Sequence, residues 1–471
     1  MGNVPQLNTD KPLRIFRAIA SGTGGENGWL RSVVSTLPAP SRLMPIAYSF
    51  ADQGLAVGAN FLANVMLART QTKEEYGMFA LSYSVFTFLA ALHNCAILEP
   101  YTVYGSGRYR DCSPQYLRLM ARSNFLFGLV LSGVISLLCL VFWRVAPHLA
   151  SRALVGLGIT VGVLLSGIFL RRAFYVQHQP ALAAKSSLIF FVMVAVGLMV
   201  ALRAHLLDGL WVFVILALGW TVAGACYGGR LPLGKVRAGF LKEEPGYWGV
   251  HWEYTRWVLI TAFVFQLMTQ GYYWLVAGFL SVREVGELRA MYNLIAPVDQ
   301  VFIALSYVVL PGMAAHYTMK RMDYLLLLWK RYTLAIFGVT ALFALGVRIL
   351  GQQVMHLLYA GRFDGLAPLL FLLALLPLLM AIGNTTAQAL KATEKPKLVF
   401  YGFLSSGAAT FAAGIPLVMH FGLRGAVYGM LLSGATFSVA VGIGFLSAVH
   451  GKGQEQTTDM RLGSIAAEER P

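Results

Sequence analysis

Residues 43–100 read LMPIAYSFADQGLAVGANFLANVMLARTQTKEEYGMFALSYSVFTFLAALHNCAILEP, and this stretch decides the fold. It contains two long apolar runs, residues 44–68 and 77–98, which are separated by a short polar turn. Each run has about the 20 apolar residues that an α-helix needs to cross a bilayer. The stretch therefore predicts a pair of membrane-spanning helices.

The composition extends this prediction to the whole chain. Apolar residues make up 57% of the 471 residues, charged residues make up only 12%, and the mean hydropathy is +0.64. Soluble domains contain about 25% charged residues. With a window of about 20 residues, twelve apolar runs are found, so we predict an all-α polytopic membrane protein. The other ten runs are 124–146, 153–170, 182–202, 209–228, 257–280, 290–313, 332–350, 366–389, 398–420 and 425–447.

The longest internal loop separates the sixth span from the seventh. The segment Lys73-Glu-Glu-Tyr-Gly before the second span resembles Val282-Arg-Glu-Val-Gly before the eighth span. Two parallel six-helix repeats are a recurrent plan of transporters. We therefore predict two six-helix lobes around a central cavity. The expected parts are a basic cytoplasmic tail (1–43), an N-terminal lobe (44–228), a cytoplasmic linker (229–256), a C-terminal lobe (257–447) and a second cytoplasmic tail (448–471).

The chain has a formal net charge of +16, and the distribution of its lysines and arginines relative to the membrane explains this excess. If the N-terminus is inside, 27 of the 37 lysines and arginines fall in inside segments. The positive-inside rule then predicts that both termini are cytoplasmic. This asymmetry accounts for most of the basic excess, so we expect no nucleic-acid partner.

The sequence has no catalytic or cofactor-binding motif. It contains no Walker A loop, no GxSxG and no HExxH, and its four cysteines have no metal-ligand spacing. We therefore expect no cofactor, no metal site and no enzyme. A membrane-embedded glycan ligase or polymerase stays a remote alternative, because such an enzyme would be expected to have a large loop outside the membrane.

The first span carries Asp52, an ionisable residue where hydrocarbon is expected. A carboxylate at the centre of a membrane helix costs about 2.5–3.5 kcal/mol on insertion scales, so it should face a partner or a cavity. Asn60 and Asn64 share a slowly rotating helix face with it. We predict that this face, with Asp52, lines the cavity. The alternative is a structural hydrogen bond to a neighbouring helix.

Other polar residues inside the spans extend the candidate site. His93 near the end of the second span lies at roughly the depth of Asp52, and a His–Asp pair there could exchange a proton. A hydrogen bond of His93 at the headgroup level is the alternative. Gln266 and Gln270 lie in the middle of the seventh span, and Asp299 follows Pro297 in the eighth. We expect these residues to line the same cavity.

Three basic residues are candidates for binding a pyrophosphate group. They are Arg171, Arg172 and Lys185. A guanidinium group binds such an anion with two parallel hydrogen bonds. Alternatively, these residues set the topology and contact lipid headgroups.

The first two spans resemble a known family. The run Ala51-Asp-Gln-Gly-Leu-Ala-Val-Gly-Ala-Asn and its continuation Glu74-Glu-Tyr-Gly-Met-Phe-Ala-Leu-Ser-Tyr, His93-Asn and Leu98-Glu-Pro resemble bacterial polysaccharide-biosynthesis flippases of the Wzx type. These belong to the multidrug/oligosaccharidyl-lipid/polysaccharide exporter superfamily. The resemblance covers residues 45–100, and beyond them only the span count, the six-plus-six plan and the orientation agree.

The resemblance implies a MATE-like bundle of two six-helix lobes and a function in the bacterial inner membrane. The expected activity is translocation of an undecaprenyl-pyrophosphate-linked oligosaccharide by alternating access, driven by an ion gradient, for O-antigen or exopolysaccharide synthesis. Such a gradient would give Asp52 and Asp299 a role in ion coupling. The expected partners are this lipid-linked substrate, membrane lipids, a polysaccharide polymerase and a chain-length regulator. The alternative is a cation-coupled multidrug exporter, in which Asp52 and Asp299 would bind a cationic drug.

Overall fold

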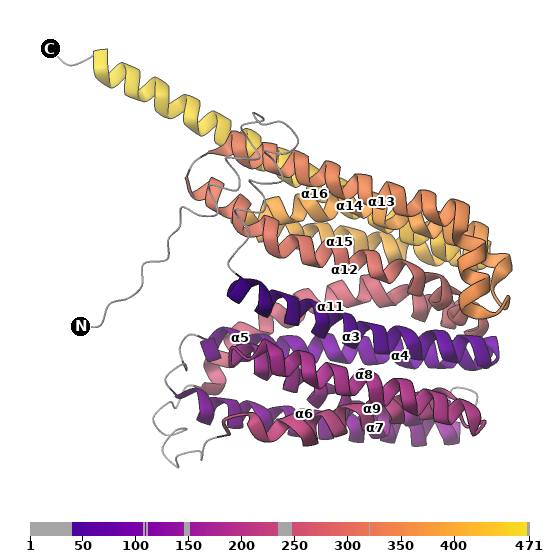
Figure 1. The fold of residues 1–471 in the computed structure, drawn as a ribbon. Helices are drawn as coiled ribbons and strands as arrows, with labels where there is room; N and C mark the ends of the chain where they lie inside the picture. Colours follow the sequence, from indigo (N-terminus) through magenta and orange to yellow (C-terminus); the bar gives the residue numbers. More distant parts are fainter. Residues whose placement is uncertain are drawn as a thin grey trace.

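The computed structural model describes residues 40–106, 109, 112–145, 151–233, 247–319 and 321–468. The predicted basic tail up to residue 39 and residues 234–246 of the predicted linker lie outside the described residues. The described part is nearly all helical and contains no strand (Figure 1). The prediction of an all-α membrane fold is confirmed.

Twelve helices of 17 residues or more follow one another in the described part, in the order of the predicted spans. They are α3 (Pro40–Thr70), α4 (Lys73–His93), α6 (Ser113–Val145), α7 (Arg152–Val176), α8 (Pro180–Arg203), α9 (Gly209–Tyr227), α11 (Tyr247–Phe279), α12 (Val282–Thr318), α13 (Met322–Tyr359), α14 (Ala367–Ala392), α15 (Pro396–Ala412) and α16 (Gly414–Glu468). Shorter elements are the π-helical turn η1 (Asn94–Leu98), α5 (Glu99–Ser106) and two 3₁₀ turns, η4 (Gly228–Arg230) and η5 (Asp364–Leu366).

Eight of the described helices could cross a membrane by length and apolar composition alone. The long helices that do not meet this criterion are α3, α11, α12 and α15. Helix α15 has only 17 residues, whereas α3, α11 and α12 contain six of the ten candidate polar residues of the sequence analysis. Such residues are tolerated in a membrane only where they face the protein interior. The composition of these three helices therefore indicates that each has one polar, inward face.

The helices run side by side in two groups. In Figure 1, α3, α4 and α6 to α9 form the lower group, α12 to α16 form the upper group, and α11 lies between them. Within the lower group α3 packs on α8, and in the upper group α16 packs on α14 and α15. Helix α12 also packs along α4, which joins the two groups. The domain boundaries given above stay a prediction.

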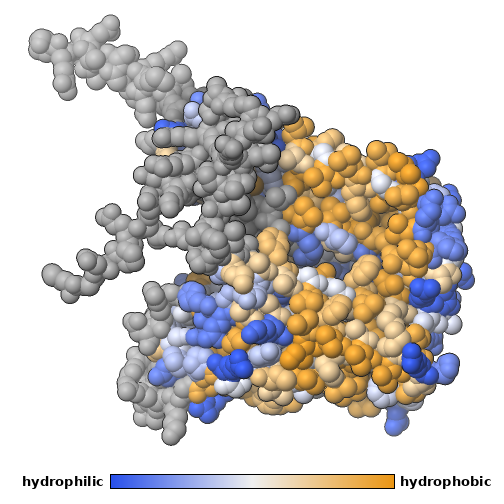
Figure 2. Space-filling model, in the orientation of Figure 1, coloured by the Kyte–Doolittle hydropathy of each residue, from blue (hydrophilic) through white to orange (hydrophobic). Residues whose placement is uncertain are grey.

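The surface matches a membrane environment. Figure 2 shows a broad hydrophobic belt in the middle and hydrophilic residues towards both ends of the helices. Helix α6 illustrates the belt, because Phe125, Leu129 and Trp143 are all exposed. Exposed apolar patches of this extent are characteristic of membrane or protein contacts. Hydrophilic residues also lie in the recess between the two groups of helices (Figure 2).

The second predicted span does not end before Pro100. The chain stays helical through η1 and α5 to Ser106, and the amide of Glu99 donates to the carbonyl of Asn94, five residues back. Proline has no amide hydrogen and clashes with the carbonyl four residues earlier, and a π-helical turn next to it absorbs this mismatch.

Two further features concern the predicted spans near the C-terminus. The polar residues 384–386 at the end of the tenth run stay helical, because α14 is continuous and the Thr385 hydroxyl donates to the Ala381 carbonyl within the helix. The eleventh predicted span is divided between α15 and the start of α16, which reverses at Gly422 (φ 59°, ψ −137°). Glycine adopts this conformation without a steric cost. After the reversal, α16 continues through the predicted second tail to Glu468.

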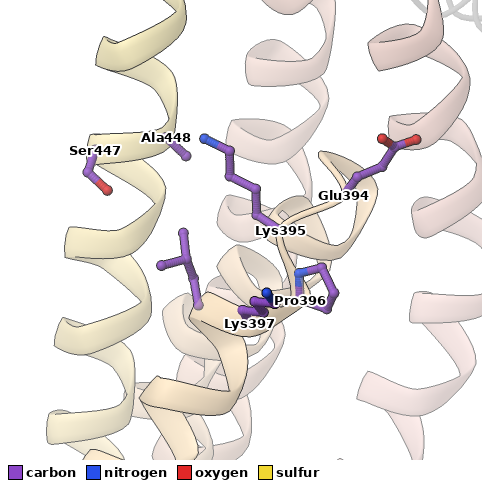
Figure 3. A pocket seen from close by; sticks show the side chains of 7 residues that line it. Glu394, Lys395, Pro396, Lys397, Ser447 and Ala448 are labelled. Carbon is purple, nitrogen blue, oxygen red and sulfur yellow. The ribbon is translucent and has the colours of Figure 1, made fainter.

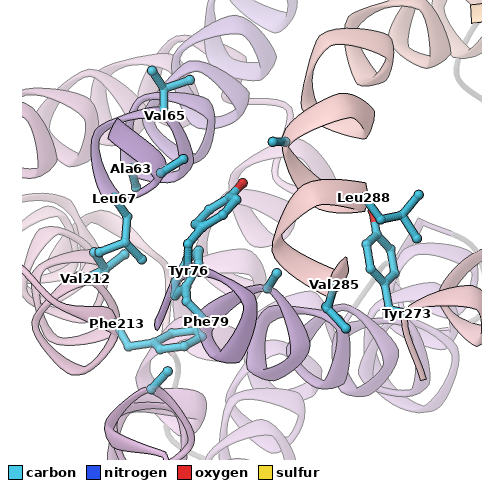
Figure 4. Packing of buried hydrophobic residues seen from close by; sticks show 14 of the residues in the cluster. Ala63, Val65, Leu67, Tyr76, Phe79, Val212, Phe213, Tyr273, Val285 and Leu288 are labelled. Atoms are coloured by element: carbon cyan, nitrogen blue, oxygen red, sulfur yellow. The ribbon is translucent and has the colours of Figure 1, made fainter. Parts of the chain in front are cut away.

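The largest core cluster lies where α3, α4, α9 and α12 meet (Figure 4). Phe79 of α4 and Phe213 of α9 pack with ring centroids 5.3 Å apart. Val285 and Leu288 lie at the start of α12, and both are completely buried. Helix ends around this core have specific caps, since Thr72 and Glu75 form a capping box at α4 and Asp208 caps α9.

A glycine of α7 allows close packing against α9. A Cβ at Gly167 would overlap the Trp220 ring, which itself stacks on Phe190 with centroids 4.1 Å apart. We expect Gly167→Ala to lower the free energy of unfolding by about 1–3 kcal/mol, because the indole must move. Thermal unfolding in detergent measures the change. Gly133→Ala is the control, since nothing lies within 4 Å of its Cβ. A Gly167→Ala variant as stable as this control would contradict the prediction.

Candidate functional site

Asp52 lies at the junction of α3, α7 and α8 and is completely buried. Its carboxylate accepts two parallel hydrogen bonds from Arg171, with Nε–Oδ1 at 2.9 Å and Nη2–Oδ2 at 2.7 Å. The hydroxyls of Tyr175 and Ser187 donate to the same carboxylate at 2.8 Å and 2.5 Å. Four donors therefore satisfy the charge of Asp52 within the lower group of helices.

The spacing of residues on α7 explains this arrangement. Arg171 and Tyr175 are four residues apart and share one helix face. Ser187 comes from α8, which packs along α3. The geometry agrees with the alternative in which Asp52 bonds a neighbouring helix, and the ion-coupling role of Asp52 stays a prediction.

The predicted pyrophosphate residues are not brought together in one cluster. The guanidinium of Arg171 is occupied by Asp52, while Nη2 of Arg172 donates to the Asn94 side chain at 3.3 Å. Lys185 is exposed on α8. An anion could use Arg171 only if Asp52 released it, so the pyrophosphate role of this group stays a prediction.

His93 is completely buried but does not pair with Asp52. Its Nε2 lies 2.7 Å from Oδ1 of Asn124, and Asn124 donates to Ser166 at 3.0 Å. The hypothesis of a His93–Asp52 proton pair is therefore wrong for this structure. The reason is that α6 lies against the end of α4 and supplies an amide partner to His93, whereas Asp52 is enclosed by α7 and α8.

Asn60 and Asn64 lie one helical turn apart on α3. Each side-chain amide donates to a carbonyl one turn earlier in the helix, Asn60 to Ala56 at 2.8 Å and Asn64 to Asn60 at 2.9 Å. The oxygen of Asn64 accepts from Nε of Arg289 on α12 at 3.2 Å. This face of α3 therefore reaches across to the upper group of helices.

Arg289 is the basic residue that the sequence analysis missed. Its guanidinium carbon lies 4.5 Å from the ring centroid of Tyr83 and 5.9 Å from that of Tyr273. The residue is half-buried, and no described carboxylate lies within 4.0 Å of its nitrogens. Tyrosine rings and one amide thus hold an arginine whose charge is not neutralised by an acidic group.

The position of Arg289 in the sequence explains why it was missed. It lies only seven residues after the start of α12, and the positive-inside count places it with the ten charges outside or at span ends. The two adjacent tyrosines Tyr272 and Tyr273 in the seventh span were the one feature of the sequence that could have pointed to a site for Arg289. Seven residues correspond to about 10 Å of helix, so Arg289 lies inside the bundle and not at its end.

Of the second-half candidates, Asp299 lies near this cluster, because it interacts electrostatically with Tyr273 beside Arg289. Asp299 accepts a hydrogen bond from the Tyr292 hydroxyl at 3.0 Å and is half-buried. Gln266 accepts from Thr269 at 3.1 Å, and Oε1 of Gln270 is buried with no partner among the described groups. In the part of the chain that the structure describes, no group of three histidine, cysteine or acidic residues could hold a metal ion.

A pocket of about 560 Å³ lies at the turn between α14 and α15 (Figure 3). None of the candidate residues lines it. It is formed by Glu394, Lys395, Pro396, Lys397, Leu398, Ser447 and Ala448. This place at the helix ends separates it from the inter-helix region around Arg289.

The sequence matches no protein-family model and no curated protein. Solved structures do match. An inward-facing MATE-family multidrug resistance transporter of the MOP superfamily aligns with a TM-score of 0.71 at 12% identity, over 89% of this chain and 96% of its own. This chain has the MATE fold.

Two further solved structures also align over most of this chain. Lipid II flippase MurJ, in an inward closed conformation, aligns with a TM-score of 0.65 at 14% identity, over 84% of this chain and 86% of its own. An outward-facing MATE transporter aligns with a TM-score of 0.60 at 8% identity, over 86% and 94% of the two chains. The predicted MATE-like arrangement of the helices is therefore confirmed, and the Wzx-type resemblance stays a prediction.

Proposed function

We propose that this chain is a flippase that moves an undecaprenyl-pyrophosphate-linked oligosaccharide across the bacterial inner membrane, for O-antigen or exopolysaccharide synthesis. Arg289 is the observation that carries the proposal. A half-buried guanidinium between the two groups of helices, with tyrosine rings instead of a carboxylate beside it, suits an anionic substrate group. Diphosphate accepts the paired hydrogen bonds that a guanidinium offers.

The surroundings of Arg289 suit a diphosphate joined to a sugar. Tyr83 and Tyr273 carry no negative charge, so they do not neutralise Arg289, and their rings present aromatic faces. Asn64 adds an amide beside the guanidinium. A polar amide and aromatic rings are the groups that bind hydrated sugars through hydrogen bonds and stacking, while the lipid tail remains in the membrane.

A multidrug exporter for cationic compounds is the second candidate, and the geometry favours it less. Its substrate needs an accessible carboxylate, but Asp52 is completely buried and already accepts four hydrogen bonds. Asp299 is half-buried and accepts from Tyr292, so it is the acidic residue that this alternative would use. The MATE fold is compatible with both candidates.

The proposal includes a topology and partners. We place both termini in the cytoplasm, since 27 of the 37 lysines and arginines then lie inside. A flippase for a repeat-unit lipid needs a polymerase on the other side of the membrane, and a chain-length regulator would act with that polymerase. Coupling to an ion gradient is part of the proposal, with Asp299 and Asp52 as the acidic residues to test.

Deletion of the gene tests the proposal. The expected result is loss of surface polysaccharide together with accumulation of undecaprenyl-linked oligosaccharide on the cytoplasmic side, both reversed by the intact gene. Unchanged polysaccharide with greater sensitivity to cationic drugs would reject the flippase and support the exporter.

A further inference from the structure

The two similar segments of the sequence meet in the structure. Lys73-Glu-Glu-Tyr-Gly77 begins α4 and Val282-Arg-Glu-Val-Gly286 begins α12, and these two helices pack against each other. In this alignment Gly77 corresponds to Gly286, and Lys73 corresponds to Val282. Both segments lie at the same end of the bundle, as expected for repeats related by an axis along the membrane normal.

The contact between the segments is reciprocal. A Cβ at Gly77 would overlap the carbonyl oxygen of Val282, and a Cβ at Gly286 would lie 2.7 Å from the carbonyl oxygen of Lys73. It would also lie 3.2 Å from the Cα of Gly77. Each glycine thus faces the carbonyl at the equivalent position of the other repeat, which is the pattern of a two-fold interface.

Polar contacts cross the same end of the molecule. Nζ of Lys73 lies 2.8 Å from Oε1 of Glu287, and both side chains are mostly buried, with 24% and 13% exposed. Nη1 of Arg362 donates to the Arg69 carbonyl at 3.1 Å. These bonds join the first half of the chain to the second.

The contact lies directly over the cluster around Arg289. Gly286 precedes Arg289 by three residues, which is less than one helical turn or about 4.5 Å along α12. Asn293, one turn further, donates to the hydroxyl of Tyr76 on α4 at 2.9 Å. No side chain can fit between the two glycines, so the backbones of α4 and α12 are in direct contact next to the cluster around Arg289.

We propose that the reciprocal contact of Gly77 and Gly286, stabilised by the Lys73–Glu287 ion pair, is the gate at this end of the substrate path. The identity of the substrate rests on the proposed function, but the gate itself does not. Because the contact is two-fold, opening separates both glycines from both carbonyls in one movement. An added methyl group at either glycine prevents the closed state, and loss of the ion pair weakens it.

Thiol accessibility tests the gate without any substrate. The reporter is Asn60→Cys, a half-buried position on the α3 face below the contact, in a chain whose Cys95, Cys112, Cys139 and Cys226 are replaced by alanine. A membrane-impermeant thiol reagent is added to intact cells, from the side where we place this end. The unaltered gate is expected to protect the reporter.

Gly286→Ala is expected to raise the labelling rate from outside by about tenfold, the size of an overpacking penalty. Its control is Gly278→Ala at the same end of the bundle, where nothing lies within 4 Å of the Cβ. Glu287→Gln is expected to raise labelling by about fivefold. Its control is Arg283→Gln, because Arg283 contacts Glu287 at 3.6 Å within α12 and does not cross to α4.

Unchanged protection in Gly286→Ala and Glu287→Gln, both present in the membrane in normal amounts, would overturn the proposal. If Gly286→Ala fails to fold, Glu287→Gln decides, since glutamine keeps the size of the side chain and removes only its charge. Increased labelling in both variants together with normal polysaccharide after gene deletion would keep the gate and reject the proposed substrate.

Discussion

Asp52→Ala is expected to destabilise the folded protein by about 3–5 kcal/mol, because it leaves the buried Arg171 guanidinium without its carboxylate. The pair is nearly inaccessible to solvent, with 0% of the Asp52 side chain and 15% of the Arg171 side chain exposed. Solvent therefore cannot replace the lost partner. The fraction of monodisperse protein after heating in detergent measures the loss.

The control for this variant is an ion pair at the surface. His356 and Asp364 are 2.7 Å apart, with 68% and 30% of their side chains exposed. Asp364→Ala is expected to cost less than about 1 kcal/mol, because water screens such pairs. Equal thermal stability of Asp52→Ala and the unaltered chain would contradict the prediction.

A double variant separates the structural role of Asp52 from ion coupling. Asp52→Leu combined with Arg171→Met replaces both charges with apolar side chains, and such replacements of buried pairs recover most or all of the stability. If the folded double variant transports normally, the pair is structural. If it folds but does not transport, the coupling hypothesis gains its support.

Arg289→Gln is expected to lower the transport rate by about 10- to 100-fold. The estimate follows from the loss of charge-assisted hydrogen bonds to an anion, each worth about 1.5–3 kcal/mol. Arg289→Lys keeps the charge but loses the planar pair of donors, so an intermediate rate is expected. The measurement is the rate of flipping of the lipid-linked oligosaccharide in reconstituted vesicles.

Arg203→Gln is the matched control for this loss. Arg203 ends α8 and is exposed, so its charge reaches water in either state of the transporter. We expect an unchanged transport rate. A normal rate in folded Arg289→Gln would reject Arg289 as an anion site, and gain of transport of a cationic drug would favour the exporter.

The order and number of the helices follow from local sequence. Each of the twelve predicted runs corresponds to a long helix or, for the eleventh, to α15 and the start of α16. Apolar length is a property of a continuous segment, and the bilayer requires it of each span separately. The sequence could therefore be divided into helices without knowledge of their contacts.

Local periodicity grouped the polar residues of α3 on one face, and the role of this face in lining a cavity stays a prediction. Asp52 and Asn64 both have partners on other helices. The identity of these partners could not be predicted, since Arg171 is 119 residues from Asp52 and Arg289 is 225 residues from Asn64. Helix periodicity gives the direction of a side chain, whereas helix packing chooses what it meets.

The sequence by itself determined the membrane class, the helical order and the similarity of the segments around Gly77 and Gly286. Only the tertiary structure decided that Asp52 is neutralised by Arg171, that Arg289 lies among tyrosines, and that the two glycine segments touch. The physical reason is that hydrophobic length and helical periodicity act within one segment. Charge pairing and close backbone packing instead depend on which segments the fold places side by side.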